Sequence, residues 1–338
     1  MVFMDLAAGA ADFLDGKHMK IVVTDHRFAD LNQERRVVEA AGGALIEGQA
    51  RSAADVVALA ADADAILTAR APIDATVIRA LERCRVIVRY GIGVDTIDIP
   101  EATRRGIRVA NVPDYCLAEV ADHTVALMLV LLRRLIPARQ LAQAESWSIQ
   151  DMPEIRRLDT LSAGLLGFGR IGKLVAERLS AFGMRILVHD PHIVPEHAEG
   201  VEFVTLAELL ARADILSLHA PLTRDSHHIV GAEALAAMRP TAFLVNSSRG
   251  GLVDEQALLT ALDAGTIAGA ALDVVESELV ATSVRRALVN HPRAFVTAHT
   301  AWLSKEARAE LQRKAAETAV ANLKGEPRNV VNLATLEA

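Results

Sequence analysis

The chain has 338 residues, of which 51% are hydrophobic, 23% are charged and only 4% are aromatic. This length exceeds the usual size of one domain, so we expect two domains with cores packed mainly by Ala, Val, Leu and Ile. The formal net charge of −7 argues against the clustered basic face that nucleic-acid binding needs, and we expect no nucleic-acid partner.

Cysteine usage and hydropathy narrow the class further. Cys84 and Cys116 are too few for a disulfide framework and match no zinc pattern, which is typical of ordinary packing in a reducing cytoplasm. The apolar run at residues 125–132 is too short to cross a membrane. Residues 1–18 lack the basic head of a signal peptide. We therefore expect a cytoplasmic protein with an N-terminal extension at 1–18.

In the first part of the chain, short apolar or β-branched runs predict strands, and a longer polar stretch predicts a helix. In chain order these are a strand at 20–24, a helix at 32–41, and strands at 63–68 and 85–88, with helical segments between them. We expect this first domain to span residues 19–113.

The second part repeats the same alternation. It begins with a long apolar helix at 117–132, which we expect to cross between the domains. The predicted strands that follow are 161–166, 185–188, 215–218, 243–245, 267–272 and 294–296, and the predicted helices are 173–182, 206–210, 255–264 and 305–323. Such alternation predicts an α/β fold with mostly parallel sheets. We expect the second domain at 114–302, with 303–338 returning to the first domain.

A glycine-rich turn follows the predicted strand at 161–166. Gly167, Gly169 and Gly172 have the spacing of a dinucleotide fingerprint between a strand and a helix. The glycines permit a tight turn, close approach of a pyrophosphate and close helix packing, while the helix start attracts phosphate. Asp190 follows at the expected distance of about 20 residues, where a carboxylate accepts hydrogen bonds from the ribose of NAD and repels the 2′-phosphate of NADP. We predict NAD as the cofactor.

Three further side chains each follow a predicted strand of the second domain: Arg249, Glu278 and His299. Ligands of doubly wound sheets bind at these strand ends. Arginine bonds a carboxylate bidentately, and histidine exchanges a proton near neutral pH. A carboxylate beside a histidine raises the histidine pKa and fixes the ring. The set is what reduction of a small 2-oxo acid needs, and we predict these three residues as catalytic.

Taken together, the motifs resemble those of the D-isomer-specific 2-hydroxyacid dehydrogenases, over nearly the whole chain from Lys20 onward. The matching segments are GIGVDTIDI (91–99), LLGFGRIG (165–172), LHAPLT (218–223), LVNSSRGGLVDE (244–255), GAALDV (269–274) and AHTAW (298–302). The resemblance implies two Rossmann-like domains with parallel sheets and an active-site cleft between them. It also implies a homodimer and hydride transfer between NAD(H) and a small 2-oxo or 2-hydroxy acid of the D series.

The resemblance also implies roles for individual residues. Arg249 would bind the substrate carboxylate and carbonyl, His299 would be the acid/base, and Glu278 would be its partner. Asp273 would hold the nicotinamide carboxamide. The implied cofactor-binding residues are Thr124, Gly167, Phe168, Gly169, Arg170, Ile171, Gly172, Asp190, His219, Ala220, Pro221, Thr223, Ser247, Ser248, Asp273 and His299. The implied substrate-binding residues are Arg89, Tyr90, Gly91, Ile92, Gly93, Arg249 and Trp302.

Within the family, the sequence is most similar to the C-terminal-binding-protein branch, which contains transcriptional corepressors as well as bacterial dehydrogenases. The similarity rests on Arg89, the segment SHHIV (226–230) and Trp302. By analogy, Arg89 and Trp302 would contact the carboxylate and the tail of the substrate. Two departures stand out, since Leu279 and Ala298 replace prolines that the family usually has beside the acid and the histidine. They loosen the backbone without removing a functional group.

Several alternatives stay open at this point. Arg89 could form a structural ion pair, and Trp302 could fill a domain interface. His219 is expected to act through its backbone, and His227 and His228 are expected to be non-catalytic. No cluster has metal-ligand spacing, so we expect no metal. The chain could also be an NAD(H)-binding, corepressor-like scaffold with little turnover, or a phosphite-type dehydrogenase.

Overall fold

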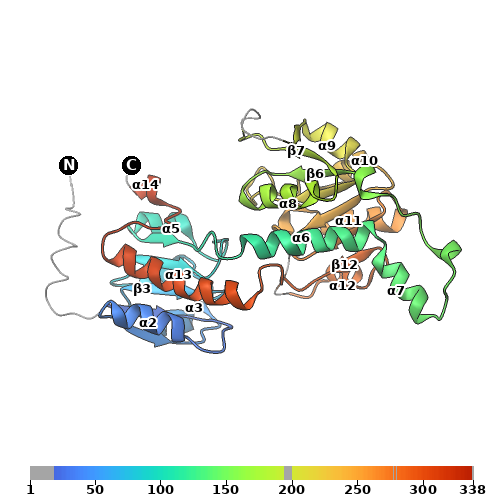
Figure 1. Cartoon of the computed structure of the whole chain (residues 1–338). Helices are drawn as coiled ribbons and strands as arrows, with labels where there is room; N and C mark the ends of the chain where they lie inside the picture. Colours follow the sequence, from blue (N-terminus) through green and yellow to red (C-terminus); the bar gives the residue numbers. More distant parts are fainter. Residues whose placement is uncertain (1–18, 194–199, 277, 279, 337–338) are drawn as a thin grey trace. The chain divides into compact units, whose positions relative to one another are not determined.

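The computed structural model describes residues 19–193, 200–276, 278 and 280–336 (Figure 1). The expected extension at 1–18 and the departure at Leu279 lie outside the described residues. By its internal contacts the chain divides into two compact units. Unit 1 comprises Met1–Tyr115 with Ser304–Ala338, and unit 2 comprises Cys116–Leu303.

Unit 1 is built on a five-stranded parallel sheet in the order β2-β1-β3-β4-β5. The strands are β1 (Lys20–Val23), β2 (Ala44–Glu47), β3 (Ala65–Thr68), β4 (Val86–Arg89) and β5 (Arg108–Ala110). Every residue of β3 is buried, which is the pattern of a parallel strand covered on both faces.

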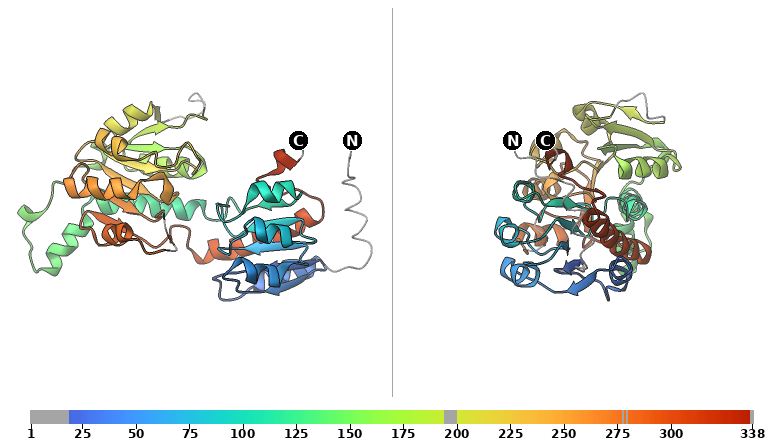
Figure 2. Two further views of the ribbon diagram at one scale, coloured as in Figure 1. Left: turned by 180° about the vertical axis from the view of Figure 1, so that it is seen from behind. Right: turned by 90° about the vertical axis from the view of Figure 1, so that its left-hand side faces the viewer.

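Helices cover both faces of this sheet, as the two views in Figure 2 show. The helices of unit 1 are α2 (Asn32–Ala40), α3 (Ala53–Ala60), α4 (Ala75–Ala80), α5 (Ile99–Arg104), α13 (Lys305–Leu323) and the short α14 (Leu333–Leu336). Ser52 begins α3 with a capping box, in which its hydroxyl accepts from the Asp55 N–H and the Asp55 carboxylate accepts from the Ser52 N–H. The late helix α13 packs against α2, β3 and β4, so the end of the chain completes unit 1 (Figure 1).

Unit 2 contains a seven-stranded parallel sheet in the order β12-β11-β10-β9-β6-β7-β8. The strands are β6 (Ser162–Leu166), β7 (Arg185–His189), β8 (Glu202–Phe203), β9 (Ile215–Leu218), β10 (Phe243–Asn246), β11 (Gly269–Leu272) and β12 (Ala294–Val296). The first strand of this unit, β6, lies inside the sheet and pairs with both β7 and β9. The order of the strands reverses there, which makes this point the switch point where such folds bind ligands.

The helices of unit 2 are α6 (Leu117–Leu132), α7 (Leu135–Gln143), α8 (Arg170–Ser180), α9 (Leu206–Arg212), α10 (Ala232–Ala237), α11 (Glu255–Ala264) and α12 (Ser283–Asn290). The 3-10 turns in the described part of this unit are η2 (Ile149–Asp151), η3 (Leu158–Thr160) and η5 (Gly250–Leu252). Helix α6 packs against α8, β10 and β11 within this unit. Among the described residues, none of the helices combines the length and the hydropathy that crossing a bilayer needs.

Residues 135–160, which we call the arm, extend away from the sheet of unit 2 in both views (Figures 1 and 2). Helix α7 buries none of its residues. Trp147 and Ile149, farther along the arm, are each 87% exposed.

Candidate active site

The glycine turn after β6 needs its first glycine for two reasons. Gly167 has a φ of +95°, which side chains rarely tolerate, and a Cβ there would lie 2.7 Å from the backbone nitrogen of Ala220. Gly172 lies equally close, since its Cβ would come 2.7 Å from the Gly167 carbonyl oxygen. The turn is therefore pressed against the residues that follow β9, at the switch point of the sheet.

Gly169 differs from both neighbours because a Cβ at this position would meet no atom within 4 Å. It stands before α8 as the helix cap and makes no side-chain cap bond, so the first N–H groups of α8 face open space with the helix dipole behind them. This arrangement fits a bound pyrophosphate. Arg170 is exposed and Ile171 is partly buried.

Asp190, just after β7, is hydrogen-bonded to the glycine turn. Its Oδ2 accepts from the Phe168 N–H at 2.8 Å, and its Oδ1 accepts from the His192 N–H at 2.9 Å. The Phe168 ring is buried and meets Phe203 edge-on. Each carboxylate oxygen keeps a lone pair after one such bond, so Asp190 is held in a position that fits acceptance of ribose hydroxyls.

The other predicted cofactor-binding residues surround the same strand ends. The Ser247 Oγ lies 2.5 Å from the Oγ1 of Thr124 on α6, and both side chains are buried. The Ser248 hydroxyl donates to the Ala220 carbonyl at 2.9 Å. Pro221 and Thr223 are exposed.

His219 contributes to this region mainly through its backbone. Its N–H donates to the Leu166 carbonyl at 2.7 Å, and its ring Nε2 lies 3.0 Å from the Ser217 Oγ. Burial lowers the pKa of His219 to about 4, so the ring is neutral near pH 7 and is poorly suited to donate a proton.

Glu278 and His299 are brought together from two loops. The Glu278 Oε1 lies 2.6 Å from the His299 Nδ1, and the two side chains are 27% and 34% exposed. A carboxylate at Nδ1 places the ring proton there and leaves Nε2 as the nitrogen that can exchange a proton with a bound molecule. The pair has the geometry of an oriented acid/base.

His299 has a left-handed backbone, with a φ of +54°, and Asp273 holds the surrounding turn in place. The His299 N–H donates to the Asp273 carbonyl at 2.8 Å. The buried Asp273 carboxylate accepts from the Thr300 and Ala301 N–H groups at 2.9 Å each and from the Thr297 hydroxyl. Both of its oxygens therefore serve the turn that carries His299, a role that the sequence did not reveal.

Arg249 follows β10 in extended backbone immediately before η5. Its guanidinium donates to the Ser248 carbonyl at 2.9 Å, and its own carbonyl accepts from the Asn246 side chain at 2.8 Å. At the next residue, Gly250, a Cβ would overlap the backbone of Val275. The turn with Arg249 thus lies directly against the loop that leads to Glu278. Trp302 is partly buried, in the segment that follows His299.

The predicted substrate loop belongs to unit 1 and follows β4. Gly91 has a φ of +132°, and a Cβ there would overlap the Arg89 guanidinium, which therefore lies over the glycine. The Asn111 side chain donates to the Ile92 carbonyl at 2.7 Å, and the Val112 N–H donates to the Gly91 carbonyl at 2.9 Å. Gly93 is partly buried.

Tyr90 lies in the same loop, but its side chain is turned into unit 1. The ring is buried, and the hydroxyl donates to the Glu34 Oε1 at 2.9 Å. Gln312 of α13 donates to the other Glu34 oxygen at 3.0 Å. Burial raises the pKa of Glu34 and of Tyr90. Any part that Tyr90 has in substrate binding therefore falls to its backbone.

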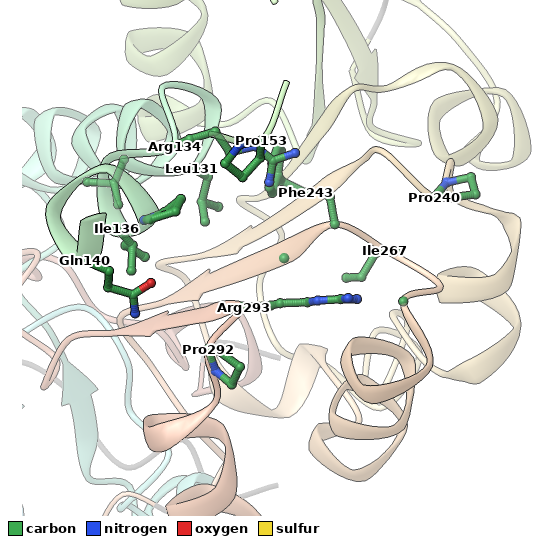
Figure 3. Close-up of a pocket in the computed structure, with 15 residues that line it drawn as sticks. Leu131, Arg134, Ile136, Gln140, Pro153, Pro240, Phe243, Ile267, Pro292 and Arg293 are labelled. Carbon is green, nitrogen blue, oxygen red and sulfur yellow. The ribbon is translucent and has the colours of Figure 1, made fainter. Parts of the chain in front are cut away.

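A pocket of about 490 Å³ lies elsewhere in unit 2 (Figure 3). Leu131, Arg134, Phe243, Ile267 and Arg293 are among the residues that line it. Phe243 begins β10, so the pocket opens at the amino ends of the strands, opposite the edge that carries the predicted site. The Arg134 guanidinium stacks over the Phe243 ring at 4.5 Å.

The structure also brings together three side chains of types that can bind a metal ion, although the sequence predicted no metal site. Ligand atoms of His227, His228 and Glu276 lie within 4.8 Å of one another. Spacing along the chain hid this cluster because the glutamate comes from a loop 48 residues after His228.

A parallel sheet of this order, with a glycine turn at its switch point and an acid after the neighbouring strand, defines a dinucleotide-binding unit of the Rossmann type. Residues 125–301 match the family described as "D-isomer specific 2-hydroxyacid dehydrogenase, NAD binding domain". The chain belongs to this family of NAD-dependent dehydrogenases.

Individual relatives agree with this assignment. The chain is 39% identical over 279 residues to a glyoxylate reductase of Korarchaeum cryptofilum, covering 80% of this chain and 83% of the relative. A D-lactate dehydrogenase of Aquifex aeolicus, solved with NAD and lactic acid, is 26% identical with a TM-score of 0.83, covering 90% of this chain and 96% of that one. An acyclic imino acid reductase solved with NADPH and D-Arg has a TM-score of 0.84 at 26% identity, covering 93% of this chain and all of the other.

Proposed function

We propose that the protein reduces a small 2-oxo acid to the D-2-hydroxy acid with NADH in the cytoplasm, and that Arg249, Glu278 and His299 carry the chemistry. The observation that carries this assignment of residues is the 2.6 Å contact between the His299 Nδ1 and the Glu278 Oε1. It lies in the same unit as the glycine turn, at the carboxyl ends of strands of the same sheet. Membership of the family supplies the reaction class.

The proton inventory follows from this pair. When bound at the glycine turn, NADH would supply the hydride for the carbonyl carbon of the substrate, losing one C–H bond and becoming NAD⁺. The His299 Nε2 gives its proton to the carbonyl oxygen, so that one C–H bond and one O–H bond form while the C=O π bond breaks. Glu278 stabilises the protonated ring beforehand and keeps it oriented afterwards, and solvent returns the proton. In the oxidation direction the neutral ring accepts the same proton.

Substrate positioning falls to cationic and backbone groups. The planar Arg249 guanidinium suits bidentate contact with the substrate carboxylate and orients the carbonyl. In unit 1 we assign the N–H groups of residues 91–93 and the Arg89 guanidinium to the same carboxylate. Trp302 is assigned to the substituent on the 2-oxo acid. Glyoxylate is the first substrate to test because the relative at 39% identity is a glyoxylate reductase.

The decisive experiment follows NADH oxidation against glyoxylate, pyruvate, hydroxypyruvate and phenylpyruvate. His299→Ala should lower kcat by about 10²–10⁴-fold, and Glu278→Gln should lower kcat with less effect on KM. His291→Ala is the matched control, since this histidine of unit 2 also pairs with a carboxylate, Asp263 at 3.3 Å. The residue assignment is wrong if His299→Ala turns over like the parent. The reaction class is wrong if the parent binds NADH and reduces none of the acids.

We further propose that two copies of the chain associate through the arm. Trp147 and Ile149 are each 87% exposed, and Leu135 and Ile155 are exposed by 50% and 41%. Apolar side chains gathered at such exposure on one segment are typical of an interface. The pocket at the root of α7 (Figure 3) offers an apolar receptor for a second copy.

Light scattering coupled to gel filtration tests this assembly. The parent should elute as a dimer, and the double variant Trp147→Asp with Ile149→Asp should elute as a monomer. Phe182→Asp is the control, because Phe182 is also exposed, by 42%, but lies at the end of α8 rather than on the arm. A monomeric parent, or a double variant that stays dimeric, would refute the proposal.

A further inference from the structure

Two histidine rings and one carboxylate converge on the surface of unit 2, from a loop after β9 and a loop after β11. The Nε2 atoms of His227 and His228 each lie 3.1 Å from the Glu276 Oε1, and the His228 Nε2 also lies 3.3 Å from Oε2. The rings stack with their centroids 3.9 Å apart and their planes inclined by 26°. Both rings therefore present the same nitrogen to one carboxylate.

The backbone holds the three side chains in these positions. The His227 N–H donates to the Thr223 carbonyl at 3.0 Å, and the His228 N–H donates to the Gly251 carbonyl at 2.8 Å. His228 has a φ of +53°, a left-handed conformation that residues other than glycine seldom adopt. That conformation sets the two consecutive rings on the same side of the chain instead of turning them apart.

A backbone hydrogen bond to Glu255 fixes the position of Glu276. Its N–H donates at 2.6 Å to a carboxylate oxygen of Glu255, a side chain that begins α11 and is itself buried. The group opposite the two rings thus comes from an anchored loop. A site whose ligands are held by such contacts needs little rearrangement to bind an ion.

The cluster allows two proton arrangements. With the proton of each neutral ring on Nε2, both rings donate to the same carboxylate oxygen. With the proton on Nδ1 instead, each Nε2 offers a lone pair, and the cluster presents three acceptor atoms within 4.8 Å of one another. A divalent cation satisfies all three at once.

The separations fit such a cation. Zinc binds imidazole nitrogen and carboxylate oxygen at about 2.0–2.2 Å, which places tetrahedral ligands about 3.3 Å apart. The nitrogen-to-oxygen distances of 3.1 and 3.3 Å lie at this value. Two imidazoles with one carboxylate prefer borderline first-row ions over Mg²⁺ or Ca²⁺.

From these observations we infer that His227, His228 and Glu276 form a binding site for one divalent cation of the Zn²⁺ class, with water completing the coordination. The site is separate from the pair of His299 and Glu278. A cation there would tie the loop after β9 to the loop after β11, and the second of these loops carries Glu278 two residues farther along. The inference does not depend on the proposed dehydrogenase activity.

The test measures Zn²⁺ bound to untagged, chelator-treated protein by equilibrium dialysis, with Co²⁺ absorbance reporting the coordination geometry. The parent should bind one Zn²⁺ per chain at low micromolar free metal, and Mg²⁺ should not compete. His228→Ala and Glu276→Gln should each weaken binding at least about tenfold. His291→Ala, which removes a histidine paired with Asp263 outside the cluster, should leave the affinity unchanged.

Two outcomes would overturn the inference: no stoichiometric Zn²⁺ on the parent, or parent-like affinity in both His228→Ala and Glu276→Gln. His228 is only partly buried and Glu276 is exposed, so we expect these variants to fold, and circular dichroism checks this. Glu276→Gln keeps the size of the side chain and removes only its charge, so it separates loss of the ligand from loss of the fold.

Discussion

Gly169→Ala separates what the turn after β6 does for a bound dinucleotide from what it does for the fold. Gly169 has an ordinary φ of −69°, and an added Cβ meets no atom within 4 Å. The free energy of unfolding should therefore stay the same or rise by up to about 1 kcal/mol. A methyl group there would lie where the backbone approaches the pyrophosphate. NADH binding should weaken at least about tenfold, or about 1.4 kcal/mol.

Gly167→Ala is the matched comparison, because Gly167 lies in the same turn, two positions before Gly169. Its φ of +95° costs a side chain about 1–2 kcal/mol, and the 2.7 Å approach to the Ala220 nitrogen adds about 1–3 kcal/mol of overpacking. The sum, about 2–5 kcal/mol, corresponds to a fall in Tm of about 5–15 °C for a unit of this size.

Thermal unfolding by circular dichroism and NADH titration by fluorescence, on the same preparations, measure both quantities. The reasoning requires Gly169→Ala to lose affinity without losing Tm, and Gly167→Ala to lose Tm. Equal losses of Tm in the two variants would show that the described turn is wrong. Parent-like NADH affinity in Gly169→Ala would show that no phosphate approaches the backbone there.

Three further predictions concern single carboxylates. Burial raises the pKa of Glu34 above its ordinary 4.5, so the folded protein holds that proton more tightly than the unfolded chain, and stability falls as pH rises past this value. Glu34→Gln should gain Tm over the parent as the pH rises above the ordinary pKa of 4.5, and an equal difference at every pH contradicts this. Asp190→Ser should raise the NADPH to NADH ratio of kcat/KM at least about tenfold, and an unchanged ratio would remove Asp190 from cofactor selection. Asp273→Asn places an amide against the N–H groups of Thr300 and Ala301. It should cost about 1–3 kcal/mol of stability and lower kcat, whereas parent-like Tm and kcat would show that the His299 turn does not need the carboxylate.

Many of the longer elements of both units were predictable because long periodic or continuous apolar runs have few other solutions. The helices Leu117–Leu132, Glu255–Ala264 and Lys305–Leu323 have the predicted bounds. Helix α11 shows the physical reason, since Asp254 caps its start and Gly265, with a φ of +70°, ends it. The predicted helix at 173–182 instead begins at Arg170, because the helix starts inside the glycine turn.

The strands that the sequence did not indicate are at sheet edges or are very short. In β2, Leu45 is the single buried residue, and β8 has two residues with none buried. Such strands carry too little hydrophobic pattern to be distinguished from loops. Helix α7 was missed for a similar reason, because it buries no residue within its unit.

For the site, residue types after strands were enough to single out the glycine turn, Asp190 and the neighbouring Glu278 and His299. What could not be predicted depends on loop paths. The Asp273 carboxylate can accept from the N–H groups of Thr300 and Ala301 only because His299 adopts a left-handed backbone conformation. His227 and Glu276 can meet only because the backbone at Gly250 lies in close contact with the backbone at Val275. The spacing of residues along the sequence does not reveal that contact.

Unit 1 has a consequence for synthesis on the ribosome. Its sheet is made before residue 115, but α13, which packs on β3 and β4, emerges only after all of unit 2. Until then the places on β3 and β4 that α13 covers are open, and the nascent chain carries an uncovered apolar surface while unit 2 is being synthesised. A chaperone that holds such surfaces has its natural target here. A chain truncated before α13 would then keep all of unit 2 but leave unit 1, which is synthesised first, without the helix that completes it.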